Sequence, residues 1–122
     1  MKKLFVPLIT ILILTLAACS SDKSSYETIP LTDVTKKAEQ GYIILDVREE
    51  NEFAEGHIPN AQNKPLSQLQ QDDFEQLSKE EKYVVICRSG NRSQTASEIL
   101  EAEGYEVVNV AEGMSTWTGE IE

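Results

Sequence analysis

One cysteine stands at a junction where a thiol could do chemistry. Cys87 follows the apolar run Val84-Val85-Ile86 and precedes a polar loop that carries Arg88, Gly90 and Arg92, after which a helical pattern begins. Gly90 permits a tight turn, so the N–H groups of the loop can converge on one point and bind an anion. The dipole of the following helix and the two guanidinium groups would add positive potential. Such surroundings lower the pKa of a cysteine and favour the nucleophilic thiolate.

Two other interpretations of this cysteine are available. A cysteine that ends a strand is often buried and inert, with neighbouring arginines that simply face water. A metal site is the second possibility, but beyond the first 19 residues the chain offers only Cys87 and His57 as soft ligands, too few for structural zinc. We therefore expect no metal and no cofactor, and we interpret the junction as the loop of a nucleophile.

The segments that must position this loop alternate between strand and helix. Apolar runs predict strands over 26–29, 42–47, 61–64, 83–86 and 105–110. Helices are predicted over 32–40, 49–54, 93–103 and 113–117, with short surface helices within 67–81. This alternation predicts a parallel sheet covered by helices on both faces. Ligands bind at the carboxyl ends of such strands, where Cys87 lies.

Several side chains near this end of the sheet are secondary candidates. Asp46 and Arg48 end the second long strand, and we expect them to pair with each other or with the loop arginines and to hold the entrance in place. A purely structural ion pair is the preferred interpretation, with Arg48 as a substrate contact the alternative. The only histidine, His57, is not expected to act as a general base, because the loop already favours the thiolate without one. The acidic run 49–55 is predicted to be a solvated helix face, and Trp117 a core or lid residue.

The first 19 residues have the pattern of a bacterial lipoprotein leader. Met1-Lys2-Lys3 is basic, residues 4–18 are almost wholly apolar, and Leu16-Ala17-Ala18-Cys19 resembles a lipobox. Fifteen residues at the helical rise span about 22 Å, less than the roughly 30 Å hydrocarbon core. We predict a signal peptide over 1–18, lipidation of Cys19 and a flexible tether over 19–25. This predicts an extracytoplasmic domain over 26–122 that is lipid-anchored to the cell membrane. An uncleaved anchor is the alternative.

The overall charge limits the classes of partner. The chain has 11 basic and 21 acidic side chains, a net charge of −10. This balance lacks the basic patch of a nucleic-acid-binding protein, so no nucleic-acid partner is expected. With Cys19 lipidated, Cys87 has no partner for an internal disulfide.

Three segments together resemble the rhodanese family. The motif CRSGNRS, residues 87–93, resembles the active-site loop of rhodanese-domain sulfurtransferases, in which four residues separate the cysteine from an arginine. The segments ILDVREENEFAEGHIPNA, residues 44–61, and GYEVVNVAEGMSTW, residues 104–117, are similar to the other signatures of the family. The resemblance covers about residues 26–119. It implies the rhodanese-like α/β fold, a central five-stranded parallel sheet with helices on both faces.

The resemblance also implies a reaction and its residues. Cys87 would accept sulfur from an anionic donor such as thiosulfate, carry it as a persulfide and pass it to cyanide or a thiol. The cradle around that sulfur would be formed by Arg88, Ser89, Gly90, Asn91 and Arg92. A thiosulfate sulfurtransferase of this kind needs no cofactor, and we expect it to act as a monomer.

The sequence departs from the family pattern in two places, and other functions remain open. Asn60 replaces a common glycine and tolerates the same left-handed conformation. Glu112 replaces one glycine of a common pair, and we expect it to approach the site and repel anions. A phosphatase or arsenate reductase on the same fold would have five residues between cysteine and arginine, rather than four. A non-catalytic module or a dedicated sulfur carrier is the other alternative.

Overall fold

The computed structural model describes residues 25–122. The predicted leader, Cys19 and most of the tether lie outside the described residues. The described part is built on a five-stranded sheet in the order β1-β5-β4-β2-β3, and all four neighbouring pairs are parallel. The strands are β1 (Glu27–Ile29), β2 (Ile43–Asp46), β3 (Gln62–Asn63), β4 (Lys82–Cys87) and β5 (Glu106–Gly113). The prediction of a five-stranded parallel sheet is confirmed.

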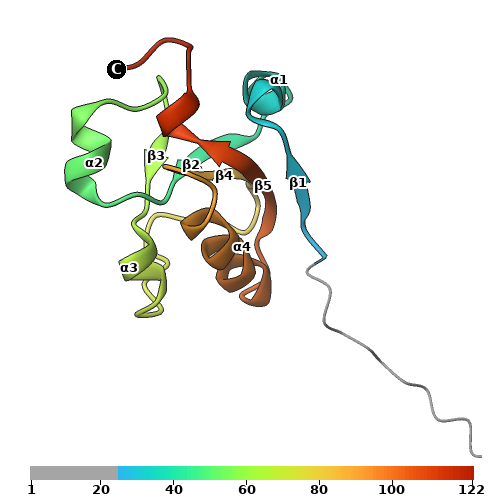
Figure 1. Cartoon of the computed structure of the whole chain (residues 1–122). Helices are drawn as coiled ribbons and strands as arrows, with labels where there is room; N and C mark the ends of the chain where they lie inside the picture. Colours follow the sequence, from blue (N-terminus) through green and yellow to red (C-terminus); the bar gives the residue numbers. More distant parts are fainter. Residues whose placement is uncertain (1–24) are drawn as a thin grey trace, which may run out of the picture.

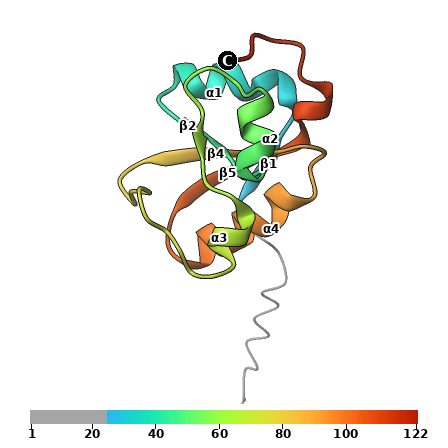
Figure 2. The same cartoon turned by 90° about the vertical axis from the view of Figure 1, so that its left-hand side faces the viewer.

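Helices lie on both sides of this sheet, as Figures 1 and 2 show. Their bounds are η1 (Leu31–Asp33), α1 (Val34–Glu39), α2 (Glu50–Glu55), α3 (Leu66–Leu69), α4 (Arg92–Ala102) and η2 (Met114–Thr116). The predicted elements all appear, with edges that differ by one to three residues. Only Leu66–Leu69 is helical at or near the segment 67–81, and most of the rest of that segment forms turns. Its apolar residues are too few to hold a longer helix against the sheet.

Two apolar clusters hold the layers together, one on each face of the sheet. Alternate residues of β4 point to opposite faces. Val84 and Ile86 pack with residues of η1 and α1, while Tyr83, Val85 and Cys87 pack with α3 and α4. Ile44 and Leu45 of β2 likewise belong to opposite clusters, so β2 and β4 are apolar on both faces, which explains their continuous apolar runs.

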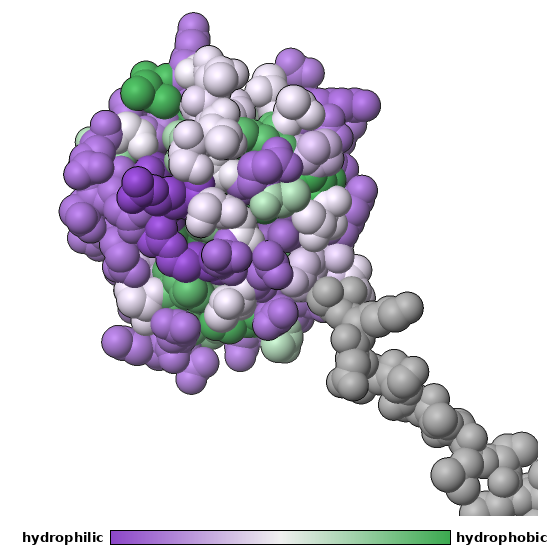
Figure 3. All heavy atoms as spheres, viewed as in Figure 1, coloured by the Kyte–Doolittle hydropathy of each residue, from purple (hydrophilic) through white to green (hydrophobic). Residues whose placement is uncertain are grey.

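The outer surface is mainly hydrophilic on the face shown in Figure 3. Among the described residues, Ile121 is the one large hydrophobic side chain classed as exposed, at 62%. Within residues 25–122, none of the helices has the length and apolar character needed to cross a bilayer.

Helix α2 differs from the other α-helices because it has no fully buried side chain. It follows the end of β2, and its Glu52 side chain contacts Arg92 at the start of α4, so it lies by the end of the sheet where the strands finish. Glu49 and Glu52 form a reciprocal capping box at its start, and Gly56 ends it at φ 153°. Since little apolar packing holds α2, polar contacts must position it, and these contacts lie next to Cys87.

Candidate active site

Cys87 is the last residue of β4, a central strand, and α4 begins five residues later. The cysteine is 1% exposed, so its thiol is shielded from bulk water. The N–H of Gly90 donates to its Sγ at 3.1 Å. Gly90 adopts φ 95°, the left-handed conformation that lets the chain turn back over the sulfur. The predicted convergence of the loop on Cys87 is therefore present.

Burial alone would raise the pKa of the Cys87 thiol, but hydrogen bonds outweigh it. The Ser93 hydroxyl and the N–H groups of Ser93, Gly90 and Ser89 stabilise the thiolate and hold the pKa below the ordinary cysteine value. The Ser93 hydroxyl also lies 3.4 Å from the Val110 carbonyl oxygen, and its single proton can serve only one acceptor at a time. The charged sulfur is the stronger acceptor of the two.

Ser93 also stabilises the Cys87 thiolate, and the sequence-based list of cradle residues missed it. It is fully buried in the first turn of α4, where helical N–H groups have no partner within the helix. The sequence did point to Ser93, because it is the last residue of the CRSGNRS motif. The predicted cradle stopped one residue earlier, at Arg92.

The end of β5 packs directly against the cysteine loop. Between β4 and β5 the register shifts, so that Val85 pairs with Asn109 but Cys87 pairs with Gly113. A Cβ on Gly113 would lie 2.3 Å from the Cys87 carbonyl oxygen, and a Cβ on Gly90 would lie 2.1 Å from the Ala111 carbonyl oxygen. The Ser115 N–H also donates to the Arg88 carbonyl at 3.0 Å. Backbone contacts on two sides therefore hold the loop in shape.

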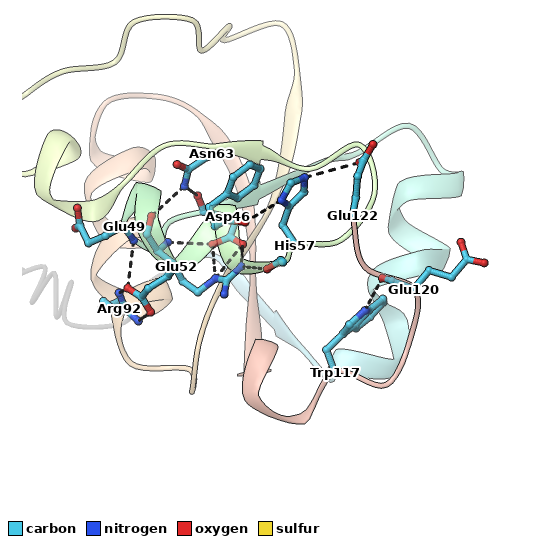
Figure 4. A network of polar contacts seen from close by, with 12 residues as sticks. Asp46, Glu49, Glu52, His57, Asn63, Arg92, Trp117, Glu120 and Glu122 are labelled. Carbon is cyan, nitrogen blue, oxygen red and sulfur yellow. Dashed lines mark hydrogen bonds and ion pairs between the residues drawn. The ribbon is translucent and has the colours of Figure 1, made fainter.

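The two loop arginines have different surroundings. Arg88 is exposed, and none of the hydrogen bonds or ion pairs among residues 25–122 involves its guanidinium. Arg92 instead forms a two-pronged ion pair with Glu52 of α2, at 2.6 Å and 2.9 Å (Figure 4). This pairing, led by the hydrogen bond from Arg92, lowers the pKa of Glu52 to about 2. The same bond is the main cause that raises the pKa of Arg92.

Two acidic residues near the loop have specific partners. The prediction that the run 49–55 is a solvated helix face was wrong for Glu52, which forms an ion pair with Arg92. The Glu112 carboxylate accepts the Leu31 N–H at 2.9 Å and so caps the start of η1, and its repulsion of anions at the site stays a prediction. A local sequence pattern shows neither contact, because the two residues are 40 positions apart in the first pair and 81 in the second.

Asp46 and Arg48 pair with each other, as their preferred interpretation stated. Arg48 Nη2 lies 2.7 Å from Asp46 Oδ2 and also donates to the Gly56 carbonyl at 2.8 Å. Both side chains are buried. Asn63 of β3 completes the network by donating to the carbonyls of Asp46 and Arg48 (Figure 4). This network ties the start and the end of α2 to the ends of β2 and β3.

The remaining predicted residues, His57, Trp117 and Asn60, form contacts away from the cysteine loop. The His57 ring stacks on Phe53 at 3.7 Å between centroids, and its contacts are with Phe53 and Glu122 rather than with residues 87–92. Trp117 packs against the α1 side of the sheet and donates to the Glu120 carbonyl. Asn60 adopts φ 68°, the conformation expected where glycine is common. Within residues 25–122, no group of three or more His, Cys, Asp or Glu side chains could hold a metal ion.

Comparisons with known proteins agree with this geometry. Residues 31–120 match the family model described as Rhodanese-like domain. A Bacillus subtilis protein named Putative sulfurtransferase YtwF is 40% identical over 84 residues, which are 69% of this chain and 81% of that protein. Another from the same organism, named Putative sulfur carrier protein YrkF, is 35% identical over 84% of this chain but only 57% of its own length. The crystal structure of a rhodanese-related protein from Thermoplasma volcanium is 35% identical, with a TM-score of 0.72 over 80% of this chain and 98% of that one.

Proposed function

The chain belongs to the rhodanese-like domain family, and we propose that it is a sulfurtransferase that carries sulfane sulfur as a persulfide on Cys87. The observation that carries the proposal is the buried Cys87 sulfur, which accepts hydrogen bonds from the loop and the first turn of α4. Hydrogen-bond donors that are already in position stabilise a charged sulfur without reorganisation during the reaction. Two relatives bear names that refer to sulfur transfer or sulfur carriage.

The proposed reaction has two steps, and thiosulfate is a suitable donor for describing them. The Cys87 thiolate attacks the outer sulfur of thiosulfate, the donor S–S bond breaks, and sulfite leaves with the electron pair. A thiolate or cyanide then attacks the outer sulfur of the persulfide. The Sγ–S bond breaks, and its electron pair returns to Cys87. Neither step needs a metal or an external oxidant or reductant.

The loop residues have separate roles in this proposal. The N–H groups of Ser89 and Gly90 hold the negative charge on the Cys87 sulfur and later on the persulfide. Asn91 is the residue that precedes the first turn of α4, and Arg88 is the accessible cation that meets an anionic donor. Asp46 and Arg48 act further away, by fixing the ends of α2.

Mass spectrometry of the intact chain tests this function. After treatment with thiosulfate, Cys87 should gain one sulfur atom, and cyanide should remove it with formation of thiocyanate. The Cys87→Ser variant should show no adduct and no thiocyanate, while its melting temperature stays within a few degrees of wild type. Sulfur transfer that persists in this variant, or no adduct with any sulfane donor, would refute the proposal.

A dedicated sulfur carrier is the second candidate, because the name of one relative refers to sulfur carriage. A carrier would form the same adduct but would release it to a protein thiol rather than to cyanide. The two candidates therefore differ in the second step only. Measuring release to cyanide, to a small thiol and to a reduced protein thiol separates them.

We also propose that the domain works outside the cytoplasm, anchored to the membrane by lipid on Cys19. Support comes from the sequence, which ends an apolar leader with Leu16-Ala17-Ala18-Cys19. Labelled fatty acid should enter the wild-type chain and not a Cys19→Ala variant. Equal labelling of the two would exclude this anchor.

A further inference from the structure

We propose that Glu52 is a specificity-determining residue, which occupies Arg92 and thereby favours sulfur donors of low negative charge over dianions. The inference rests on the sulfurtransferase function proposed above. It concerns which class of donor the site accepts, rather than whether Cys87 carries sulfur.

Geometry is the first support. Both terminal nitrogens of Arg92 are engaged, with Nη1 at 2.6 Å from Glu52 Oε1 and Nη2 at 2.9 Å from Oε2. A two-pronged pair of this kind takes one N–H from each terminal nitrogen and fills the edge of the guanidinium that would otherwise bind an oxyanion in the same way. A sulfonate or sulfite group could form that two-pronged pair only by displacing Glu52, and the N–H groups that remain belong to a cation whose charge Glu52 already balances.

Helix α2 keeps the Glu52 carboxylate in place. Glu52 Oε1 also accepts the Glu49 N–H at 3.3 Å as part of the capping box. Farther along the helix, the Gly56 carbonyl is held by Arg48, which is buried against Asp46. Because both ends of α2 are tied down, Glu52 is presented to the cysteine loop as a fixed charge.

The balance of charge around the loop is the second support. Near Arg92 lie the carboxylates of Glu52 and Glu49 and the Cys87 thiolate, all of which favour its charged form. The side chains of Arg92 and Glu52 are only 32% and 21% exposed, so water screens the pair incompletely. Arg88 is thus the single loop cation left without an ionic partner among the described residues. A donor with two negative charges is repelled more strongly than a donor with one.

From this charge balance we expect the preferred sulfur donor to be a sulfane compound with at most one negative charge, such as an organic persulfide R–S–SH. The Cys87 thiolate would attack its outer sulfur, the donor S–S bond would break, and the thiolate RS⁻ would leave with the electron pair. Atoms and charge balance, and the sulfur atoms exchange partners without an added oxidant or reductant.

Two donors of similar shape and different charge provide the test. Thiosulfate is a dianion, whereas methanethiosulfonate has a methyl group in place of one charged oxygen and is a monoanion that releases methanesulfinate. The Glu52→Gln variant keeps an oxygen for the Glu49 N–H but loses the charge. Glu52→Gln removes a unit charge that lies several ångströms from the bound donor in a partly hydrated site. This should raise kcat/KM roughly threefold per unit of donor charge, so about tenfold for thiosulfate and about threefold for methanethiosulfonate. Any change in the pKa of Cys87 affects both donors and cancels in their ratio.

Glu55→Gln is the matched control, because Glu55 lies on the same helix, is exposed and forms none of the ion pairs or side-chain hydrogen bonds of residues 25–122. It should leave the donor ratio unchanged. Glu52→Ala is the second variant. It also removes the charge of Glu52 and should shift the donor ratio in the same direction as Glu52→Gln, so it decides the question if Glu52→Gln does not fold.

The outcomes separate this inference from the proposed function. A donor ratio that shifts towards thiosulfate in Glu52→Gln or Glu52→Ala, but not in Glu55→Gln, supports a role for Glu52 in specificity. A ratio equal to wild type in a folded variant, or one that Glu55→Gln shifts as much, overturns it, even if Cys87 still accepts sulfur. If neither donor leaves sulfur on Cys87 of the wild-type chain, the proposed function itself fails.

Discussion

Gly113 offers a direct test of whether the shape of the cysteine loop controls the thiol. Its φ of −166° is available to any residue, so replacing it with alanine adds no backbone strain. The added Cβ would nevertheless lie 2.3 Å from the Cys87 carbonyl oxygen and 2.4 Å from the carbonyl carbon and oxygen of Arg88. Backbone atoms cannot rotate away as a side chain can, so the loop or the end of β5 must move.

The size of the effect follows from the distances. Restoring an ordinary contact needs a displacement of about 1 Å, which is enough to break the 3.1 Å bond from the Gly90 N–H to Cys87 Sγ. A hydrogen bond to a charged group contributes about 1.5–3 kcal/mol. Because one pKa unit corresponds to about 1.4 kcal/mol, the pKa of Cys87 should rise by about one to two units in Gly113→Ala.

The assay is the rate of alkylation of Cys87 by iodoacetamide as a function of pH, together with thermal unfolding. Gly113→Ala should move the midpoint of the alkylation profile upward and slow alkylation at pH values below that midpoint, while overpacking costs about 1–3 kcal/mol of stability. Gly41→Ala is the control, because Gly41 has φ 95° and a Cβ added there would meet no atom within 4 Å. It should lose about 1 kcal/mol of stability without any change in the alkylation midpoint. A folded Gly113→Ala protein with the wild-type midpoint would refute the idea that this packing holds the N–H donors in place.

Two further predictions concern the ion pairs beside the loop. Asp46→Asn should cost about 3–5 kcal/mol in chemical denaturation, because it leaves the buried Arg48 without a counter-charge. Glu106→Gln removes only an exposed pair of 3.8 Å and should change nothing measurable, so similar losses in the two variants would contradict the argument. The second prediction follows from the pKa of Glu52, which the bond from Arg92 lowers from 4.5 to about 2. The stabilisation from this pair should be complete above about pH 4.5 and lost as the pH falls towards 2, so wild type should lose more stability over this range than Glu52→Gln. Parallel curves for the two proteins, measured by urea unfolding at each pH, would show that the pair contributes nothing.

Much of the fold can be predicted from local patterns in this sequence. The continuous apolar runs around Ile44 and Val85 require strands buried on both faces, and such strands occur in parallel sheets between helices. Gly41 and Gly104 end α1 and α4 at positive φ, as glycine after a helix predicts. The position of Cys87 at the carboxyl end of a central strand follows from the same alternation.

The short elements were less predictable because their stabilising partners are distant. Segment 67–81 has few apolar residues, and most of it forms turns, held in part by contacts such as that between Lys64 and Asp73. The shift in register that brings Gly113 beneath the loop also depends on pairing between β4 and β5. A single strand does not contain that information.

What the sequence alone determined was the place of Cys87 at the carboxyl end of a central strand, since the apolar run, the thiol, the glycine turn and the following helix are consecutive. Only the tertiary structure decided which charges reach that thiol. The partner of Arg92 is 40 residues away and the partner of Glu112 is 81 residues away, in each case on a different element. An ion pair forms where folded elements bring opposite charges together in space, and residue type and spacing along the chain do not specify that arrangement.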